Sequence, residues 1–269
     1  MKLIQGFILI TLSLLFFSCT ENNAQKTKNK DSLNIANTDV FTDHILDSAS
    51  TGLVFKPTGN YNVIKSSISQ KREQFKKAYL ASIDSFERAV ILDSARFFFT
   101  NSLLNELIPH WYGTVWDFNG YTNVPNSGVI ACGYFISTTL KHLGVNMNRY
   151  RFAQQAGMNE AKTLDPDHNY RLIRIHHSEA IDSVVNVIEE EFRPGLYALG
   201  LSNHVGYIYI KDKTAYFIHS NYIDGHVMTE KARYSDAFWS SIYVFTDLTY
   251  NDFLIESWIL NKEIVVITE

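Results

Sequence analysis

One cysteine and two histidines have the residue types and the spacing of a thiol nucleophile with its base. Cys132 stands where the helical pattern of "CGYFISTTLKHL" begins, and the N–H groups at a helix start stabilise a thiolate. His204 opens the strand-like "HVGYIYI" and His219 ends the next one, "TAYFIH", so an antiparallel hairpin places both at the same end. A cysteine–histidine pair also needs a third polar group to orient the imidazole. We therefore assign Cys132 as nucleophile, His204 as base and His219 as the orienting residue, with Asn221 on the same strand face as the substitute.

The second cysteine of the chain, Cys19, follows an apolar N-terminal segment. Residues 1–18 start with a positive charge at Lys2, continue as "LIQGFILITLSLLFFS" and lack an A-x-A cleavage site. The end of this run, "LLFFSC", resembles the lipobox of bacterial lipoproteins, with residues 1–18 as signal peptide and Cys19 as the lipidated first residue. An uncleaved anchor helix is the alternative, although the run is short for a membrane span. In both cases the folded part lies outside the cytoplasm beside a membrane. Once Cys19 carries lipid, Cys132 has no disulfide partner.

Composition and charge restrict the class of protein. The chain has 269 residues, of which 46% are hydrophobic and 14% aromatic, enough for a sizeable packed core. Its net charge is −4 without a long basic run, so nucleic-acid binding has no electrostatic support. The residue after Cys19 is threonine, not an aspartate that would retain a lipoprotein at the inner membrane. We therefore expect a cell-envelope protein on the periplasmic side of the outer membrane.

Changes in composition and in hydrophobic spacing divide the chain into segments. After the signal peptide we expect a flexible polar tether at 19–60, a helical extension at 61–110, a catalytic domain at 111–246 and a C-terminal helix and strand at 247–269. The catalytic segment begins with an aromatic-rich loop, "HWYGTVWDFNGYTNVPNSG", whose glycines and proline indicate turns. Short β-rich runs with tight links follow a series of helical patterns. This order predicts an α+β fold with an antiparallel sheet, not a doubly wound one.

An ordered set of motifs from Tyr112 to Asn221 resembles the NlpC-type, papain-like cysteine peptidases of bacterial cell walls. That family places its cysteine at the start of a helix, after a glycine-bearing loop with a tyrosine upstream. In chain order the matching residues are Tyr112, Gly128, Cys132, Arg151, Gln154, Gly157, Pro194–Gly195, His204 in "HVGYIYI" and His219 in "FIH". The resemblance covers under half of the chain. It departs at the cysteine, where the family's Asp-Cys-Ser-Gly is Ala-Cys-Gly-Tyr.

The resemblance implies a fold, a reaction and a set of roles. The fold would be papain-like, with the antiparallel sheet packed on the cysteine-bearing helix, and the reaction would cleave amide bonds in peptidoglycan stem peptides without a metal or organic cofactor. Cys132 would attack, and its N–H and the Tyr112 hydroxyl would hold the oxyanion. Asp117 could replace the missing aspartate as an amine-binding group, although a turn-forming role suits it equally. Trp111 and Trp116 could form the walls of the substrate groove, although core packing suits them equally.

Other functions stay open at this point. The wider superfamily, including lecithin–retinol acyltransferase-like proteins, uses the same pair in acyl transfer, which a membrane tether would suit. A non-catalytic, wall-binding lipoprotein is a third possibility, because a cysteine on an apolar helix face is often only a packing residue. A long apolar channel would favour acyl transfer, whereas a polar groove with a carboxylate near Cys132 would favour a peptidase. The pair His176–His177 lacks partners at metal-ligand spacing, so we expect no metal site there.

Overall fold

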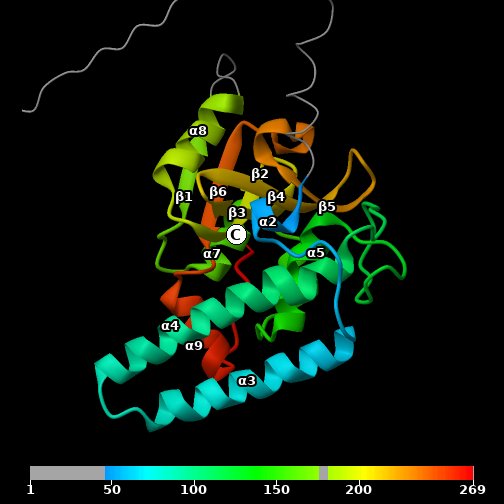
Figure 1. Ribbon diagram of the computed structural model, residues 1–269. Helices are drawn as coiled ribbons and strands as arrows, with labels where there is room; N and C mark the ends of the chain where they lie inside the picture. The colour runs from blue at the N-terminus through cyan, green and yellow to red at the C-terminus, as the bar shows by residue number, and fades with distance from the viewer. Residues whose placement is uncertain (1–45, 176–180, 269) are drawn as a thin grey trace, which may run out of the picture. The chain divides into compact units, whose positions relative to one another are not determined.

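The computed structural model describes residues 46–175 and 181–268 (Figure 1). These residues belong to one compact unit, Asp39–Glu269. The expected signal peptide, Cys19, most of the expected tether and the pair His176–His177 lie outside the described residues. Within the described ranges no helix is long and apolar enough to cross a membrane.

An antiparallel sheet forms the centre of the unit. Within the described residues it has six strands in the order β1-β6-β2-β3-β4-β5. The strands are β1 (Arg171–Arg174), β2 (Gly195–Leu201), β3 (Val205–Lys211), β4 (Thr214–Asn221), β5 (His226–Lys231) and β6 (Ile242–Asp247). Strands β2 to β5 form a meander of neighbouring antiparallel pairs, and β6 returns to the free edge of β2. Helices together with an antiparallel sheet confirm the expected α+β class.

Helices precede the sheet, interrupt it and follow it. They are α2 (Ser48–Thr51), α3 (Tyr61–Ala81), α4 (Ser85–Asn101), the π-helix η1 (Ser102–Leu107), the 3₁₀ turn η2 (Ile108–Trp111), α5 (Cys132–Leu143), α6 (Arg149–Ala153), α7 (Gly157–Leu164), α8 (Ile181–Glu191), the 3₁₀ turns η3 (Ala232–Tyr234) and η4 (Asp236–Phe238), and α9 (Asp252–Leu260). Helix α5 ends at Gly144, which takes a left-handed conformation with φ 102°. This is the conformation that glycine adopts at helix ends without strain.

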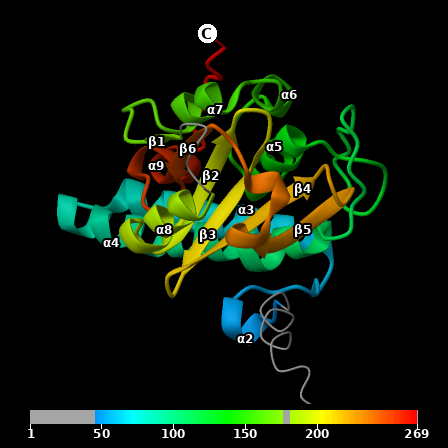
Figure 2. The same ribbon diagram turned by 90° about the horizontal axis from the view of Figure 1, so that it is seen from above.

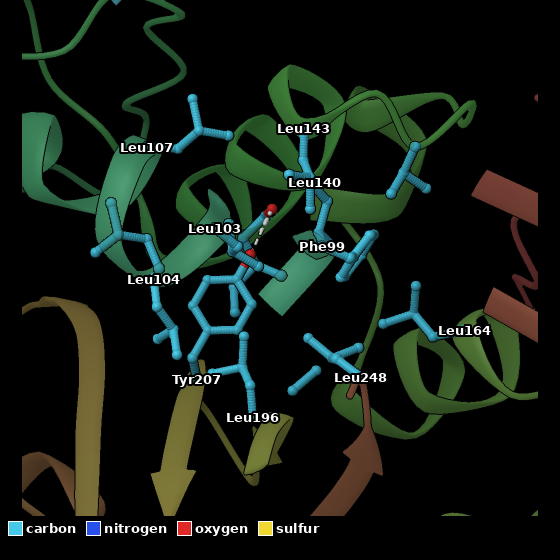
Figure 3. Packing of buried hydrophobic residues seen from close by; sticks show 14 of the residues in the cluster. Phe99, Leu103, Leu104, Leu107, Leu140, Leu143, Leu164, Leu196, Tyr207 and Leu248 are labelled. Carbon is cyan, nitrogen blue, oxygen red and sulfur yellow. Dashed lines mark hydrogen bonds between the residues drawn. The ribbon is translucent and has the colours of Figure 1, made fainter. Parts of the chain in front are cut away.

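Helices cover both faces of the sheet, and strand alternation decides which side chains meet them (Figure 2). On one face, Ile208 and Phe217 pack with Val185 of α8. On the other face, Tyr207 packs with the cluster that contains Leu103 of η1 and the apolar side of α5 (Figure 3). The Tyr207 hydroxyl lies 2.7 Å from Thr139 Oγ1, so its buried oxygen is satisfied. This packing fixes the cysteine-bearing helix across strands β3 and β4.

The helical extension shares this second cluster. Helices α3 and α4 form a hairpin that contacts α9 (Figure 1). Trp258 of α9 packs edge-on against Phe99 of α4, and its indole N–H donates to the Leu143 carbonyl at the end of α5. Residues 61–110 therefore help to hold the far end of the cysteine-bearing helix, and they belong to the same hydrophobic core as the sheet.

The expected C-terminal strand is wrong. Residues 262–268 form no ladder with the sheet. Ile264 donates its N–H to the Asn146 carbonyl, Ile267 donates to Thr163 Oγ1, and Val266 is buried. The β-branched run "EIVVIT" therefore packs without strand pairing, with backbone hydrogen bonds to Asn146 and Thr163. Tertiary packing overrides strand propensity here.

Candidate active site

Cys132 is the first residue of α5, and hydrogen bonds to two other segments of the chain hold the loop before it. The Ala131 N–H donates to the Gly120 carbonyl at 2.9 Å, and Ser220 of β4 donates its hydroxyl to the Ile130 carbonyl at 2.8 Å. Gly133 is required next to the cysteine, because a Cβ there would collide with the Ala153 carbonyl oxygen of α6. The sulfur is thus held at a helix start beside strands β3 and β4.

His204 and His219 meet at the same end of the β3–β4 hairpin. His204 Nε2 lies 2.7 Å from His219 Nδ1, and His219 Nε2 lies 3.0 Å from Oε1 of Glu230 on β5. Both rings are almost completely buried. Gly206 makes this possible, because a Cβ at that position would collide with the Phe217 ring that stacks on His219. The sheet therefore holds a carboxylate–imidazole–imidazole chain.

This chain determines which nitrogen of His204 can act as a base. When Glu230 is ionised it accepts the proton of His219 Nε2–H, and His219 Nδ1 then accepts from His204 Nε2–H. The remaining nitrogen, Nδ1 of His204, carries a lone pair and no proton. Glu230 also accepts a hydroxyl hydrogen bond from Ser235 at 2.6 Å, which holds the carboxylate in place. The arrangement is that of a positioned general base.

Burial keeps both reacting groups neutral in the resting protein. It raises the pKa of the Cys132 thiol, although the backbone N–H of Val205 acts in the opposite direction. Burial lowers the pKa of His204, and the neighbouring His219 lowers it further. Since the two shifts disfavour a thiolate–imidazolium pair, proton transfer must accompany substrate binding or attack.

Cys132 and His204 line the same two cavities. Among the described residues no hydrogen bond joins the sulfur to the His204 ring, whose bonded partner is His219. Catalytic contacts of this kind are often long without substrate and tighten in the complex. The shared cavity walls place the nucleophile and the base where one substrate can reach both.

The larger cavity is broad and aromatic. It has a volume of about 910 Å³, and Trp116, Phe118, Tyr121 and Tyr222 line it together with the cysteine. Tyr222 contacts the His204 ring edge-on, with centroids 5.1 Å apart. The expectation that Trp116 forms a wall fits this geometry, and its buried indole N–H has no hydrogen-bond partner among the described residues. The size is within the range of about 300–1,000 Å³ of small-molecule sites.

The smaller cavity also borders the cysteine and shares several lining residues with the larger one. Its volume is about 210 Å³, and Glu160 of α7 is one of its lining residues. Ser202 and Asn203, in the link between β2 and β3, line it as well. The sulfur is therefore flanked by an aromatic cavity and by a small cavity that contains a carboxyl group.

Three expected site residues lie elsewhere. The Tyr112 hydroxyl accepts a hydrogen bond from Thr229 at 2.9 Å and lines neither cavity; burial raises its pKa to about 12. Asp117 is exposed and closes a turn by accepting from the Asn119 N–H at 2.8 Å. Asn221 accepts from the Ile223 N–H at 2.7 Å in the β4–β5 turn, and its amide donates to Glu230 Oε1 at 3.5 Å, so it contacts the carboxylate and does not orient the His204 ring.

The expectation that Trp111 lines the groove is also wrong. Its side chain is fully buried, and its indole N–H donates to the Tyr61 hydroxyl at 2.8 Å. The aromatic loop thus divides its residues between core and cavity. Trp111 and Tyr112 pack inward at the start of the loop, whereas Trp116 reaches the cavity further along.

Two carboxyl groups were not identified from the sequence. Glu230 lies on a strand that is polar in sequence, and only the pairing of His219 with Met228 in the β4–β5 register brings it near the imidazole. Glu160 lies in a short helix without a motif around it. Within the described residues no group of three or more histidine, cysteine, aspartate or glutamate side chains could hold a metal ion.

The chain matches no protein-family model, no curated protein and no solved structure. Its class is therefore defined by the fold and the site alone: an α+β protein with a cysteine at a helix start and a buried histidine–histidine–glutamate chain beside it.

Proposed function

We propose that the chain is a cysteine-dependent hydrolase that cleaves amide bonds. The observation that carries the proposal is the chain from Glu230 through His219 to His204, which leaves one unprotonated nitrogen on a residue that shares two cavity walls with Cys132. A histidine that merely filled the core would need no second imidazole and no carboxylate behind it. This is the arrangement that nucleophilic catalysis requires.

The proposed reaction has two steps. His204 accepts the thiol proton while the Cys132 sulfur attacks the amide carbon, and the resulting imidazolium gives that proton to the departing amine, which leaves a thioester. Water then attacks the thioester carbon while His204 accepts a water proton. The carbon–sulfur bond breaks, His204 returns the proton to the Cys132 sulfur, and the product departs as a carboxylic acid that ionises in water. Helix α5 has no side-chain cap at Ala131, so its first N–H groups remain available to the oxyanion.

Peptidoglycan peptides are the proposed substrate, and a papain-like, NlpC-type fold is the proposed finer class. Both rest on the ordered motifs of the sequence and are supported by a cysteine helix packed on an antiparallel meander with both histidines at one end. The resemblance assigned an oxyanion role to Tyr112. Its hydroxyl instead bonds Thr229 and lines neither cavity, so the proposal gives Tyr112 no part in the reaction. The proposed location is the cell envelope, with lipid on Cys19. Retention of a Cys19→Ser variant in the detergent phase on partitioning would contradict this anchor.

A second candidate, acyl transfer, is favoured by the aromatic wall of the larger cavity. Trp116, Phe118 and Tyr222 offer rings that an acyl chain could contact as readily as a sugar or a peptide. Both candidates pass through a thioester on Cys132. They differ in the acceptor, which is water for a hydrolase and an alcohol or amine for a transferase.

The test uses isolated peptidoglycan and the full-length chain in detergent. We expect the wild-type chain to release soluble fragments with new amino and carboxyl termini, and Cys132→Ala and His204→Ala to release none. Glu190→Gln, an exposed substitution on α8, is the matched control and should behave as wild type. Identical fragment profiles from the wild type and Cys132→Ala would remove the hydrolase proposal for this substrate.

A further inference from the structure

The side chain of Glu160 is a buried carboxyl group without a hydrogen-bond partner among the described residues. Only 4% of the residue is exposed, and Oε1 accepts no hydrogen bond. Burial raises the pKa of this carboxyl well above its ordinary value. Buried polar groups are almost always hydrogen-bonded, because a group that is left unsatisfied costs about 1–3 kcal/mol. An unpartnered carboxyl in a cavity beside a nucleophile therefore needs an explanation.

The backbone holds Glu160 close to the reacting groups. A Cβ on Gly157, at the start of α7, would lie 2.5 Å from the Gly200 Cα of β2, so only glycine allows this helix to lie against the strand. The contact places the first turn of α7, which includes Glu160, beside the end of β2. The carboxyl then lines the 210 Å³ cavity together with Cys132 and His204.

No described residue that lines this cavity supplies a positive charge to the carboxyl group. The lining contains no lysine or arginine, and the resting His204 is neutral. An ionised Glu160 would also disfavour the Cys132 thiolate, since the two negative charges repel. The protein thus provides an acceptor and leaves the matching donor to come from outside.

We propose that the small cavity binds a primary ammonium group of the substrate, with Glu160 as its carboxylate partner. The proposal rests on the proposed function, because the ammonium group belongs to the molecule whose carbonyl Cys132 attacks. The cavity is smaller than the about 300 Å³ of the smallest typical ligand sites, so it admits an end group and not a whole ligand. Pairing with the cation satisfies the buried oxygen and removes the repulsion on the thiolate. Substrates with an acidic group at this position are excluded, because the cavity lining offers an anion no positively charged partner.

The test measures how fast small probes of different charge modify Cys132. Methyl methanethiosulfonate is neutral, its 2-aminoethyl analogue carries an ammonium group, and its 2-sulfonatoethyl analogue carries a negative charge. In each case the thiolate attacks the thiosulfonate sulfur, a disulfide forms and methanesulfinate leaves. Rates are read from the mass of the Cys132 peptide of the full-length chain, so modification of Cys19 does not interfere. Each rate is divided by the rate of the same probe with free 2-mercaptoethanol.

The wild-type chain should prefer the 2-aminoethyl probe to the methyl probe, and the 2-sulfonatoethyl probe should be slowest. Glu160→Gln, which keeps the shape, and Glu160→Leu, which keeps an apolar volume, should each lower the preference about tenfold or more, the size of a lost charge-assisted contact. Glu190→Gln is the matched control and should keep the wild-type preference.

The outcomes separate the two proposals. If both Glu160 variants keep the wild-type preference for the 2-aminoethyl probe over the methyl probe, the ammonium site is overturned, even if Cys132 reacts readily with every probe. Failure of the neutral methyl probe to modify Cys132 in the wild type counts instead against the nucleophile. If one Glu160 variant fails to fold, as shown by its thermal unfolding, the other still decides the result.

Discussion

Glu230→Gln is expected to raise the pH at which Cys132 becomes reactive. The carboxylate lies 3.0 Å from His219 Nε2, and His219 lies 2.7 Å from His204. Its negative charge therefore stabilises the imidazolium that forms on His204 when this residue accepts the thiol proton during attack by Cys132. Glutamine keeps the size and one acceptor oxygen but removes the charge. Its amide can also donate to His219, which would reverse the proton order and put a proton on the reacting nitrogen of His204.

The magnitude follows from the strength of a hydrogen bond to a charged group. Such a bond contributes about 1.5–3 kcal/mol, and one pKa unit corresponds to about 1.4 kcal/mol. The Glu230 side chain is 20% exposed and also receives a hydrogen bond from Ser235, so part of its charge is already screened. We expect the pKa of His204 to fall further without this charge, and alkylation of Cys132 near neutral pH to slow about 10- to 100-fold.

The assay is iodoacetamide alkylation of the full-length chain from pH 5 to pH 10, followed at the Cys132 peptide by mass spectrometry. Glu190→Gln is the matched control, and His204→Ala sets the profile of a cysteine without its base. Superimposable profiles for Glu230→Gln and the wild type would refute the reasoning, because the carboxylate would then have no influence on the sulfur.

Three further predictions follow from single contacts. Gly133→Ala should destabilise the chain by about 1–3 kcal/mol in urea unfolding, because the added Cβ collides with the Ala153 carbonyl; an unchanged midpoint would contradict the close approach. Tyr112→Phe should leave fragment release within about twofold of wild type, since this hydroxyl bonds Thr229 and lines neither cavity; a much larger loss would restore its oxyanion role. Burial lowers the pKa of His142 from 6.5 to about 4, so its neutral form stabilises the fold above pH 6.5 and this contribution falls as the pH drops toward 4. His142→Gln should flatten the loss of stability over that interval, and an equally steep loss in both proteins would exclude His142 as a source.

The histidine pair could be predicted because strand geometry is local. A tight turn between two β-rich runs makes them antiparallel neighbours, so the first residue of one run and the last residue of the other must lie at the same end. The helix start at Cys132 follows in the same way from the apolar spacing and from Gly144 at its end. These signals lie within short windows of sequence and do not depend on the rest of the fold.

The remaining site residues depend on contacts between distant segments. Glu230 becomes part of the site through the register of β5, whose sequence "HVMTEK" has too few apolar residues to indicate a strand. Glu160 is brought to the cavity by a glycine–glycine contact between α7 and β2. Tyr112 was misplaced for another reason: the family resemblance, and no local pattern, assigned its oxyanion role, whereas its ring packs against Phe55 and its hydroxyl bonds Thr229. Tertiary packing decides such positions, and local pattern does not.

The most direct test of the account is the capture of a thioester on Cys132. The full-length chain is mixed with isolated peptidoglycan, quenched in acid within the first turnovers and digested, and the mass of the Cys132 peptide is measured. The account predicts an added acyl mass on Cys132 that hydroxylamine removes and that disappears as soluble fragments accumulate. Fragment release without any acyl mass on Cys132, or equal release by the Cys132→Ala variant, would contradict it.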